Sequence, residues 1–448
     1  MSATASAPDV VRELRAICGE TNVVEHPAPS RRPRLDDTVD LGEFGVAAGT
    51  APPVEVTPGS VEEIAAVLQM ANEHGLSVTP VGGVTELNPG RLRTDIVLHT
   101  ARLTQVEHYD HADLTVGVGA GMTVAQLSSM VSADKLLFAL DPALPERATI
   151  GGVLAAASHG PLRQGYGALR DFCIGIRFVT GDGRKGKGGG RVVKNVAGYD
   201  MMKLLIGSYG TLAVITSASF KLFPAPRQTR TFLAEFATAT EALKFRDMVL
   251  RSPLDPMCLE LVSPGARRWM RPEMQSDSWA MCLRASGSDT VLARYRKELG
   301  SAVMWELAGD DERNMWSAIT NFPIPADINQ SPLLTHSFLR LNATVPLHKV
   351  ASVISAVEDF AVPGSFDFGV IGRVGVGHVL ASAWPADADI CMHDDAFVDH
   401  LLRRVPCDNL AVTGSVTPWA SSPPNLASMR AVKRALDPKN VLQGRSLP

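Results

Sequence analysis

The sequence has little cysteine, and no cysteines at the close spacing of metal ligands. Its 448 residues include six cysteines, and no two of them are separated by only two residues. Zinc ribbons, iron–sulfur clusters and disulfide scaffolds depend on such spacing, so its absence argues against all three. We expect reduced, mostly buried thiols and no metal site.

A positive charge excess and a long apolar run are also missing. Lysine and arginine number 43 against 47 aspartates and glutamates, a net charge of -4. No overall positive field would draw such a chain to nucleic acid or anionic lipid. The uncharged run Leu204–Phe220 has 17 residues, and a spanning helix needs about 20. Residues 1–20 lack the apolar core of a signal peptide, so we expect a cytoplasmic chain without a transmembrane segment.

The composition is that of a globular protein with more than one domain. Apolar residues make up 45% of the chain and charged residues 20%, close to globular averages. The length suits about three domain-sized units, or two with elaborations. We expect an extended N-terminal arm at 1–49, a first domain at 50–226, a second α/β domain at 227–405 and a C-terminal segment at 406–448.

Helix and strand signals alternate along the first domain. Ser60-Val-Glu-Glu63 has the capping-box pattern that opens a helix, and Gly75 ends it. Thr123 caps a second helix, with Gln126 at the capping-box position. This alternation predicts an α/β fold, in which ligands bind where strands meet loops. Strands are expected at residues 76–80, 95–99, 114–118, 172–180 and 211–222.

Two glycine-rich runs match phosphate-binding motifs incompletely. The run from Gly181 to Gly188 is close to a P-loop, but Gly188 replaces the hydroxyl residue that holds magnesium. We interpret it as a hairpin tip. The run from Gly117 to Gly121 follows a strand, yet Met122 stands where a dinucleotide fingerprint has its third glycine. We interpret it as a tight strand-to-helix turn.

A third glycine loop, Pro80-Val-Gly-Gly-Val-Thr-Glu-Leu87, is the stronger candidate for a phosphate site. Its adjacent glycines follow a strand, so successive backbone N–H groups can converge on a diphosphate without obstruction by Cβ atoms. Thr85 can add a hydroxyl donor. Farther along, residues 149–167 are rich in Gly, Ala and Ser, a composition that allows backbone to lie against a flat ligand.

Three later stretches follow this loop in an order that resembles one family. They are Ala148-Thr-Ile-Gly-Gly152, Gly165-Tyr-Gly-Ala-Leu-Arg-Asp171 and the region from Val193 to Ile215. Together with the loop they resemble the FAD-binding domain of the vanillyl-alcohol-oxidase-type (PCMH-type) flavoproteins. Lys194-Asn-Val-Ala-Gly-Tyr-Asp200 and Leu436–Arg445 are similar to the FAD-binding E subunit of bacterial glycolate oxidase. The resemblance implies an α+β chain: a two-subdomain FAD-binding domain followed by a cap or substrate domain.

The resemblance also implies which residues bind FAD. Thr149, Gly151 and Gly152 would face the flavin or the diphosphate, and the backbone of Ile215 would meet the adenine end. The diphosphate would lie on the loop of Pro80, Val81, Gly82, Gly83, Val84, Thr85, Glu86 and Leu87, with Tyr166 and Arg170 as neighbours of the flavin. Val84 and Ala213 stand where the family often has glycine. The loop lacks the histidine of covalently flavinylated relatives, so noncovalent FAD is expected.

The catalytic machinery is less complete. Oxidising a 2-hydroxy acid needs a base for the hydroxyl proton, a cation for the carboxylate, and the flavin as hydride acceptor. The catalytic sister subunits have a His-rich motif in their second domain, and the nearest match here, Phe368–His378, contains a single histidine. His378 is the candidate base, and Arg373 and Arg340 are candidate carboxylate ligands. A structural histidine and salt-bridged arginines are the alternative interpretation.

The resemblance therefore implies the FAD-binding subunit of a glycolate-oxidase-like 2-hydroxy-acid dehydrogenase complex. Its partners would be a catalytic flavoprotein subunit and an iron–sulfur subunit, because the chain has no cluster cysteines of its own. Two alternatives stay open. One is a self-sufficient flavin dehydrogenase or oxidase of another small hydroxylated substrate, and the other is a structural subunit that binds no flavin.

Overall fold

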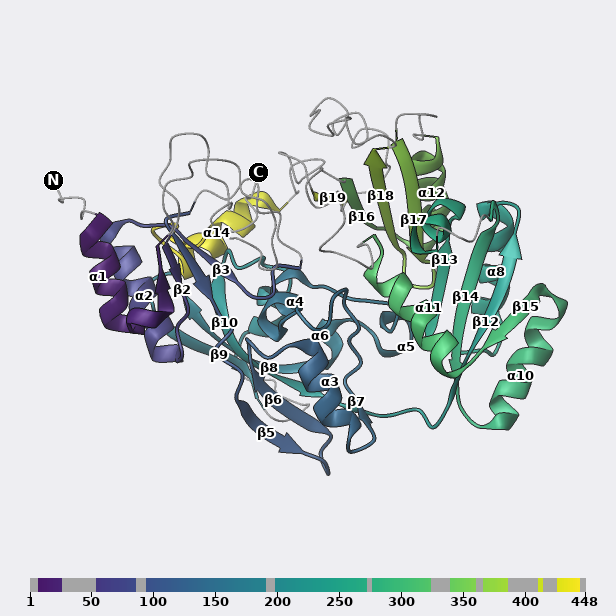
Figure 1. The fold of residues 1–448 in the computed structure, drawn as a ribbon, viewed down its shortest axis with the longest axis horizontal. Helices are drawn as coiled ribbons and strands as arrows, with labels where there is room; N and C mark the ends of the chain where they lie inside the picture. The colour runs from purple at the N-terminus through teal and green to yellow at the C-terminus, as the bar shows by residue number, and fades with distance from the viewer. Residues whose placement is uncertain are drawn as a thin grey trace. The chain divides into compact units, whose positions relative to one another are not determined.

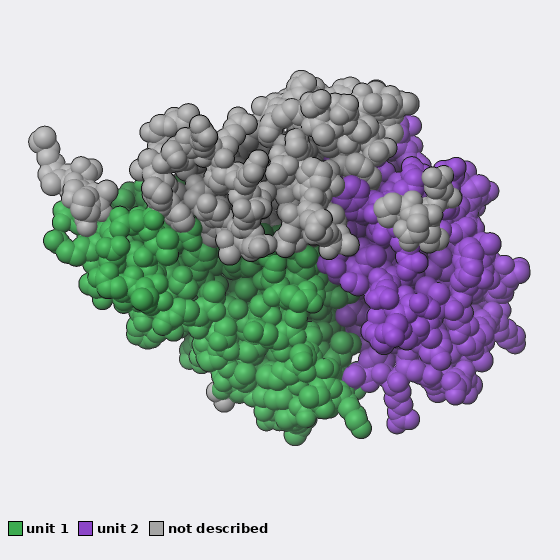
Figure 2. All heavy atoms as spheres, in the orientation of Figure 1, with its two compact units in different colours: residues 1–159, 168–224, 423–448 green, residues 160–167, 225–422 purple. Residues whose placement is uncertain are grey.

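The chain folds into two compact units (Figures 1 and 2). The computed structural model describes residues 7–25, 54–85, 94–190, 198–271, 276–323, 339–359, 366–385, 410–413 and 425–443. Unit 1 contains residues 1–159, 168–224 and 423–448, and unit 2 contains residues 160–167 and 225–422. The expected fold class, mixed helix and sheet, is confirmed in both units.

The first layer of unit 1 is a small sheet covered by two helices. Its strand order is β1-β2-β4-β3, in which β2, β4 and β3 are parallel and β1 is antiparallel. Ser60 caps α2 by accepting from the Glu63 amide, and Gly75 ends it in the left-handed conformation, as the sequence predicted. The elements are α1 (Ala7–Cys18), η1 (Glu20–Asn22), β1 (Val23–Val24), β2 (Val54–Val56), α2 (Val61–His74), β3 (Val78–Val81) and β4 (Ile96–His99).

An extended N-terminal arm is the wrong description of residues 7–25. Most of this stretch forms helix α1 and its return into β1. Val10, Leu14 and Cys18 recur at helical spacing and are buried against the first layer. Burial of this apolar face stabilises the helix, although the residues between its apolar positions are polar.

The second layer of unit 1 is a five-stranded antiparallel sheet of order β5-β6-β10-β8-β9. Thr123 and Gln126 form the predicted capping box of α3. Both glycine-run interpretations are confirmed: residues 181–184 turn between β8 and β9, and residues 120–123 join β6 to α3. The elements are β5 (Val106–Asp110), β6 (Thr115–Gly119), α3 (Val124–Ser132), β7 (Leu136–Leu137), α4 (Ile150–Ala156), α6 (Leu169–Phe172), β8 (Cys173–Thr180), β9 (Lys185–Gly189), α7 (Met201–Leu205), β10 (Ala213–Lys221) and β11 (Phe223–Pro224).

The end of the chain returns to unit 1. Helix α14 (Leu426–Leu436), yellow in Figure 1, lies beside the first layer. After it, Leu442 forms a parallel bridge with Val78 of β3. Val441 and Leu442 are buried in the same core as α1 and α2, so the C-terminal segment is part of this layer.

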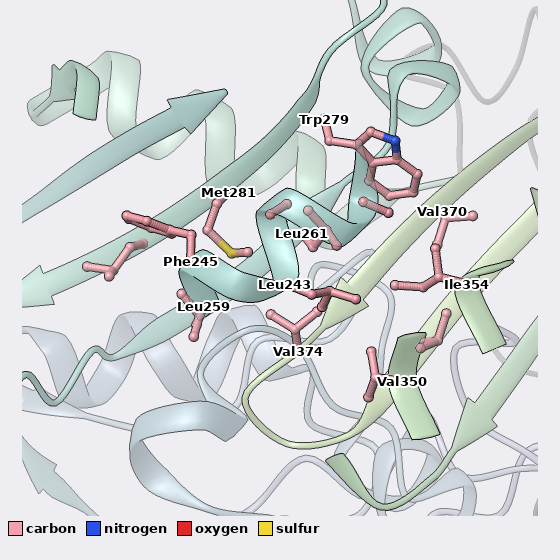
Figure 3. Packing of buried hydrophobic residues seen from close by; sticks show 14 of the residues in the cluster. Leu243, Phe245, Leu259, Leu261, Trp279, Met281, Val350, Ile354, Val370 and Val374 are labelled. Carbon is pink, nitrogen blue, oxygen red and sulfur yellow. The ribbon is translucent and has the colours of Figure 1, made fainter. Parts of the chain in front are cut away.

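Unit 2 is built on an eight-stranded antiparallel sheet of order β15-β12-β14-β13-β17-β18-β16-β19. Helices α8, α10 and α12 pack on one face, where Figure 3 shows Leu243 and Ile354 of the helices with Leu261, Met281 and Val370 of the strands. Residues of α9 and α11 pack in a second cluster together with Leu162, which comes from the 160–167 segment. The helices are α5 (Arg163–Tyr166), α8 (Ala239–Arg251), α9 (Pro264–Met270), α10 (Asp289–Leu299), η4 (Gly300–Ala302), α11 (Gly309–Asn321), η6 (Leu347–Lys349) and α12 (Val350–Glu358). The strands are β12 (Thr229–Phe236), β13 (Cys258–Val262), β14 (Trp279–Ser286), β15 (Val303–Leu307), β16 (Leu339–Thr344), β17 (Phe366–Arg373), β18 (His378–Pro385) and β19 (Leu410–Thr413).

Candidate functional site

A pocket in unit 1 brings together segments that are far apart in the sequence. It encloses about 650 Å³ of space that no atom fills, open solvent at its mouth included. Its walls come from the end of β3 and the loop after it, from α4, and from the start of β10 with the turn before it. The lining residues are Pro80, Val81, Gly82, Gly83, Val84, Thr85, Thr100, Gly151, Gly152, Ala155, Ala156, Tyr209, Gly210, Ala213, Val214 and Ile215.

The loop after β3 rests directly on the segment that leads into α4. A Cβ atom on Gly82 would overlap the Oγ1 atom of Thr149, and one on Gly83 would overlap the carbonyl oxygen of Arg147. The protein's own packing therefore requires both glycines: Gly82 packs against a side chain and Gly83 against backbone. Val84 has φ 57°, in the left-handed region that a β-branched residue rarely adopts. Glycine, which the family often has at this position, adopts the left-handed conformation without strain.

Backbone amides of this loop are available to a ligand. The N–H groups of Gly82, Gly83, Val84 and Thr85 donate to no acceptor within the described residues. Several adjacent N–H groups that face one cavity form the donor set that diphosphate oxygens accept from. The loop therefore fits the diphosphate of FAD. Glu86 and Leu87, which the sequence also placed at this site, lie outside the described residues.

Helix α4 supplies the wall that the Gly- and Ala-rich sequence predicted. Thr149 is its N-cap and accepts a hydrogen bond from the Gly152 amide at 3.3 Å through Oγ1. Thr149 itself is buried and does not line the pocket, but it contacts Gly82 and fixes the start of the helix. A Cβ on Gly152 would meet only the Thr149 Oγ1 atom, at 3.1 Å, so the remaining space at Gly152 belongs to the pocket.

The start of β10 forms the third wall because its pairing is incomplete there. Residues 213–215 pair with β8, whereas pairing with β6 begins only at Ser217, after an irregularity between Ile215 and Ser217. One edge of this short stretch is thus free of strand neighbours and lines the pocket. Ile215 lines the pocket, and its contact with the adenine end of FAD stays a prediction.

Arg147 is a contributor to the loop that the sequence analysis did not single out. None of the described residues that line the pocket has a charged side chain. The half-buried Arg147 guanidinium lies next to the loop, with Nη2 3.5 Å from the carbonyl oxygen of Gly83. A cation beside this loop would complement a bound diphosphate. Its position immediately before the Ala148-Thr-Ile-Gly-Gly152 stretch was the available sequence signal.

Other lining residues were also missed as individual site residues. The Thr100 amide donates to the Val81 carbonyl at 3.1 Å and follows the strand that pairs with β3. Tyr209 and Gly210 form a left-handed turn, with φ values of 51° and 72°. A Cβ on Gly210 would lie 2.7 Å from Cγ of Pro80, so this turn packs tightly against the end of β3.

Tyr166 and Arg170 do not line this pocket. Arg170 belongs to unit 1 and donates from Nη2 to the Ile206 carbonyl at 2.9 Å. Tyr166 belongs to unit 2, in helix α5, where burial raises the pKa of its hydroxyl. The fold thus assigns two residues of one continuous motif to different units, and their place at the flavin stays a prediction.

Two of the catalytic candidates of unit 2, Arg373 and His378, form a buried cluster with Glu260. Arg373 lies between the other two: its Nη1 is 3.0 Å from His378 Nδ1, and its Nε is 3.8 Å from Glu260 Oε1. All three residues are buried. Because arginine only donates, Nδ1 of His378 accepts, which places the imidazole proton on Nε2. Arg340 lies in β16 opposite Ser382, and its side chain is outside the described atoms.

Within the described residues, no group of three or more His, Cys, Asp and Glu side chains is placed to hold a metal ion. The same part of the chain contains no helix long and apolar enough to cross a membrane.

Comparison with known proteins identifies the cofactor. Residues 52–185, which include the loop and α4, match the family described as FAD binding domain. This chain belongs to a family of FAD-dependent oxidoreductases. FAD is its cofactor.

Relatives of this flavoenzyme are named as dehydrogenases and oxidase subunits. It is 37% identical over 249 residues to "D-lactate dehydrogenase" of Archaeoglobus fulgidus, a match that covers 55% of each chain. It is 32% identical to "Glycolate oxidase subunit GlcE" of Escherichia coli, over 52% of this chain and 67% of the relative. "Glycolate oxidase subunit GlcD" of Bacillus subtilis is 26% identical over 87% of this chain and 88% of the relative.

A solved structure shares the flavoenzyme's fold. Substrate-bound p-cresol methylhydroxylase superposes with a TM-score of 0.74 at 16% identity, over 97% of this chain and 95% of that one. At this identity the likeness concerns the fold alone. It agrees with the PCMH-type architecture that the sequence motifs implied.

Proposed function

We propose that this chain is the FAD-binding subunit of a 2-hydroxy-acid dehydrogenase complex of the glycolate-oxidase type. The observation that carries the proposal is the pocket of unit 1. Its open loop amides and small-residue walls suit FAD, and relatives named as glycolate oxidase subunits match the surrounding sequence. The substrate would be a small 2-hydroxy acid, such as the glycolate and D-lactate of the relatives' names.

In this proposal each wall of the pocket has its own role toward FAD. The amides of residues 82–85 bind the diphosphate, the Gly151–Gly152 surface lies against the flavin or diphosphate, and the free edge at Ile215 meets the adenine end. Thr149 fixes the start of α4 beneath the loop. No histidine or cysteine is present among the described lining residues, which supports noncovalent binding.

The cluster in unit 2 supports a role beside a catalytic partner. Bound FAD supplies a two-electron acceptor for the hydride from the substrate's hydroxyl-bearing carbon, and the hydroxyl proton then needs a separate base. His378 has its proton on Nε2 and its Nδ1 occupied by Arg373, so in this arrangement it holds a proton and accepts none. The Arg373 charge is likewise balanced by Glu260 rather than open to a substrate carboxylate.

A self-sufficient flavin dehydrogenase is the second candidate. The observation that favours it is the length of the match: relatives named as D-lactate dehydrogenases match almost the whole chain. The "Probable D-lactate dehydrogenase, mitochondrial" of Danio rerio is 23% identical over 98% of this chain and 91% of the relative. In this reading electrons would leave the flavin to a soluble acceptor, without an iron–sulfur partner.

Purification of the chain alone separates the two candidates. The purified flavoprotein is assayed with glycolate and with D-lactate, using an artificial dye as electron acceptor, and its partners are sought by copurification from the native source. The subunit proposal expects bound FAD, slow dye reduction, and an associated flavoprotein and iron–sulfur protein. Rapid dye reduction by the isolated chain, abolished by His378→Gln with folding retained, would favour the self-sufficient enzyme.

A further inference from the structure

The C-terminal segment contains a half-buried lysine with a complete set of partners. The ammonium of Lys433, whose side chain is 13% exposed, donates at 2.8 Å to the carbonyl oxygens of Thr211 and Leu442 and is paired with Asp437. A lysine has three N–H donors, so these contacts satisfy all of them. Burial lowers the pKa of Lys433, and the Asp437 carboxylate opposes that shift.

Asp437 connects this ammonium to the end of the chain. Its side chain is fully buried and accepts from the amides of Val441 at 2.9 Å and Leu442 at 2.8 Å. The carboxylate therefore holds residues 437–442 in one tight turn. Removing either partner of this pair would leave the other charge buried without compensation, which is strongly unfavourable.

The turn is attached to the strand that leads into the FAD pocket. The Val78 amide donates to the Val441 carbonyl at 2.7 Å, and the Gln443 amide donates to the Val78 carbonyl at 2.8 Å. Val78 begins β3, and β3 is an edge strand of its sheet. The C-terminal segment thus continues the sheet beside the strand whose last residues, Pro80 and Val81, line the pocket.

The same ammonium is attached to a second wall of that pocket. Thr211, whose carbonyl accepts from Lys433, closes the turn of residues 208–211 through a hydrogen bond from its amide to the Ser208 carbonyl. Tyr209 and Gly210 of this turn line the pocket, and Gly210 packs against Pro80. One side chain therefore joins the turn before β10 to the segment that flanks β3.

We propose that Lys433 and Asp437 form a clasp through which the C-terminal segment sets the shape of the FAD pocket. Both are positioning residues: neither lines the pocket, and they act on FAD through β3 and the 208–211 turn. The inference rests on the proposed placement of FAD in this pocket. Because coupling between two sites is reciprocal, FAD binding must in turn hold the C-terminal segment in place.

Two measurements test the clasp: the affinity of the apoprotein for FAD, and the hydrogen exchange of the C-terminal segment. Apoproteins of the wild type, Lys433→Met, Asp437→Asn and the control Lys439→Met are titrated with FAD. Lys439 is a suitable control because it lies in the same segment but is exposed, donating only to the Asn72 carbonyl. We expect Lys433→Met and Asp437→Asn to weaken FAD binding about tenfold. A loss of this size corresponds to a clasp that is closed in only about a tenth of the apoprotein molecules, because only those molecules bind FAD with full affinity. Lys439→Met should stay within about twofold of the wild type.

A second measurement needs no substitution. Hydrogen exchange of a peptide covering residues 437–443 is followed by mass spectrometry in wild-type apoprotein and holoprotein. Its amides donate within the clasp, so FAD should slow their exchange, and Lys433→Met should abolish that slowing. A merely structural lysine would affect apoprotein stability without this dependence on FAD.

The outcomes distinguish the clasp from the pocket. The proposed clasp is wrong if Lys433→Met binds FAD with wild-type affinity, or if FAD leaves hydrogen exchange at residues 437–443 unchanged. Gly152→Val in the same titration tests the pocket itself, and unchanged affinity there would overturn the site on which the clasp depends. If Lys433→Met does not fold, the wild-type exchange comparison decides alone.

Discussion

Gly83 lies so close to Arg147 that any Cβ atom at position 83 would overlap the Arg147 carbonyl oxygen. Both members of the contact are backbone, so neither can move aside as a side chain would. This contact joins the loop after β3 to the segment before α4 and sets the distance between two walls of the pocket. The Gly82-Gly83 pair therefore does more than give a ligand access to the loop, because the loop cannot pack against this segment without it.

Gly83→Ala should therefore damage the loop as well as FAD binding. We expect a loss of about 1–3 kcal/mol in the free energy of unfolding of the apoprotein, the usual cost of overpacking. Urea unfolding of the apoprotein measures the loss, and an FAD titration of the same sample measures affinity. An apoprotein as stable as the wild type would show that the contact with Arg147 is not tight in solution.

Val84→Gly should have the opposite effect on stability. A non-glycine residue in the left-handed conformation costs about 1–2 kcal/mol, and glycine removes that cost while giving up some conformational entropy. We expect a net gain of a few tenths to about 1 kcal/mol, with FAD binding retained. Thermal unfolding of the variant checks this, and a lower unfolding temperature would contradict the strain inferred at φ 57°.

Arg147→Met should weaken FAD binding mainly at low salt. The guanidinium is the cation next to the loop amides, and its attraction to a diphosphate is screened as ionic strength rises. We expect a severalfold loss of affinity that narrows at high salt, and partial retention in Arg147→Lys. Arg184→Met, which removes an exposed cation of the β8–β9 hairpin, is the matched control. Equal effects of the two methionine variants would mean that position 147 has no special role.

Arg373→Met tests the cluster in unit 2. The substitution leaves the fully buried Glu260 carboxylate without its cation, and we expect a loss of about 3–5 kcal/mol in unfolding free energy. Urea unfolding of the variant and of the wild type measures this loss. If Arg373→Met is as stable as the wild type but has lost activity, the prediction is wrong and Arg373 is again a candidate for binding the substrate carboxylate.

Local signals accounted for much of the fold. Helix α2 begins and ends where Ser60 and Gly75 predicted, and α3 has the Thr123 and Gln126 box, because these caps involve neighbours within one turn. Strands β8 and β10 follow from their apolar patterns for the same reason. Helix α1 lies where the sequence predicted an extended arm, although its buried residues recur at helical spacing.

Contacts between distant segments were not predictable from such signals. The loop after β3 was recognisable from its glycines, but the turn at Tyr209 and Gly210 reaches the pocket only through packing on Pro80. Lys433 is 222 residues from Thr211 along the chain, and nothing local marks it as a partner of that turn. The transfer of residues 160–167 to unit 2, which separates Tyr166 from Arg170, likewise depends on tertiary packing.

The most direct test of the account is the FAD affinity of Gly152→Val, measured by titrating the apoprotein alongside wild type and Gly152→Ala. A side chain at position 152 has room on the protein side except for Thr149 Oγ1, so the valine methyl groups enter the pocket. The account predicts a graded loss, small for alanine and more than tenfold for valine, with apoprotein stability changed by less than about 1 kcal/mol. Wild-type affinity in Gly152→Val, or an equal loss of folding and FAD binding, would contradict the placement of FAD in this pocket.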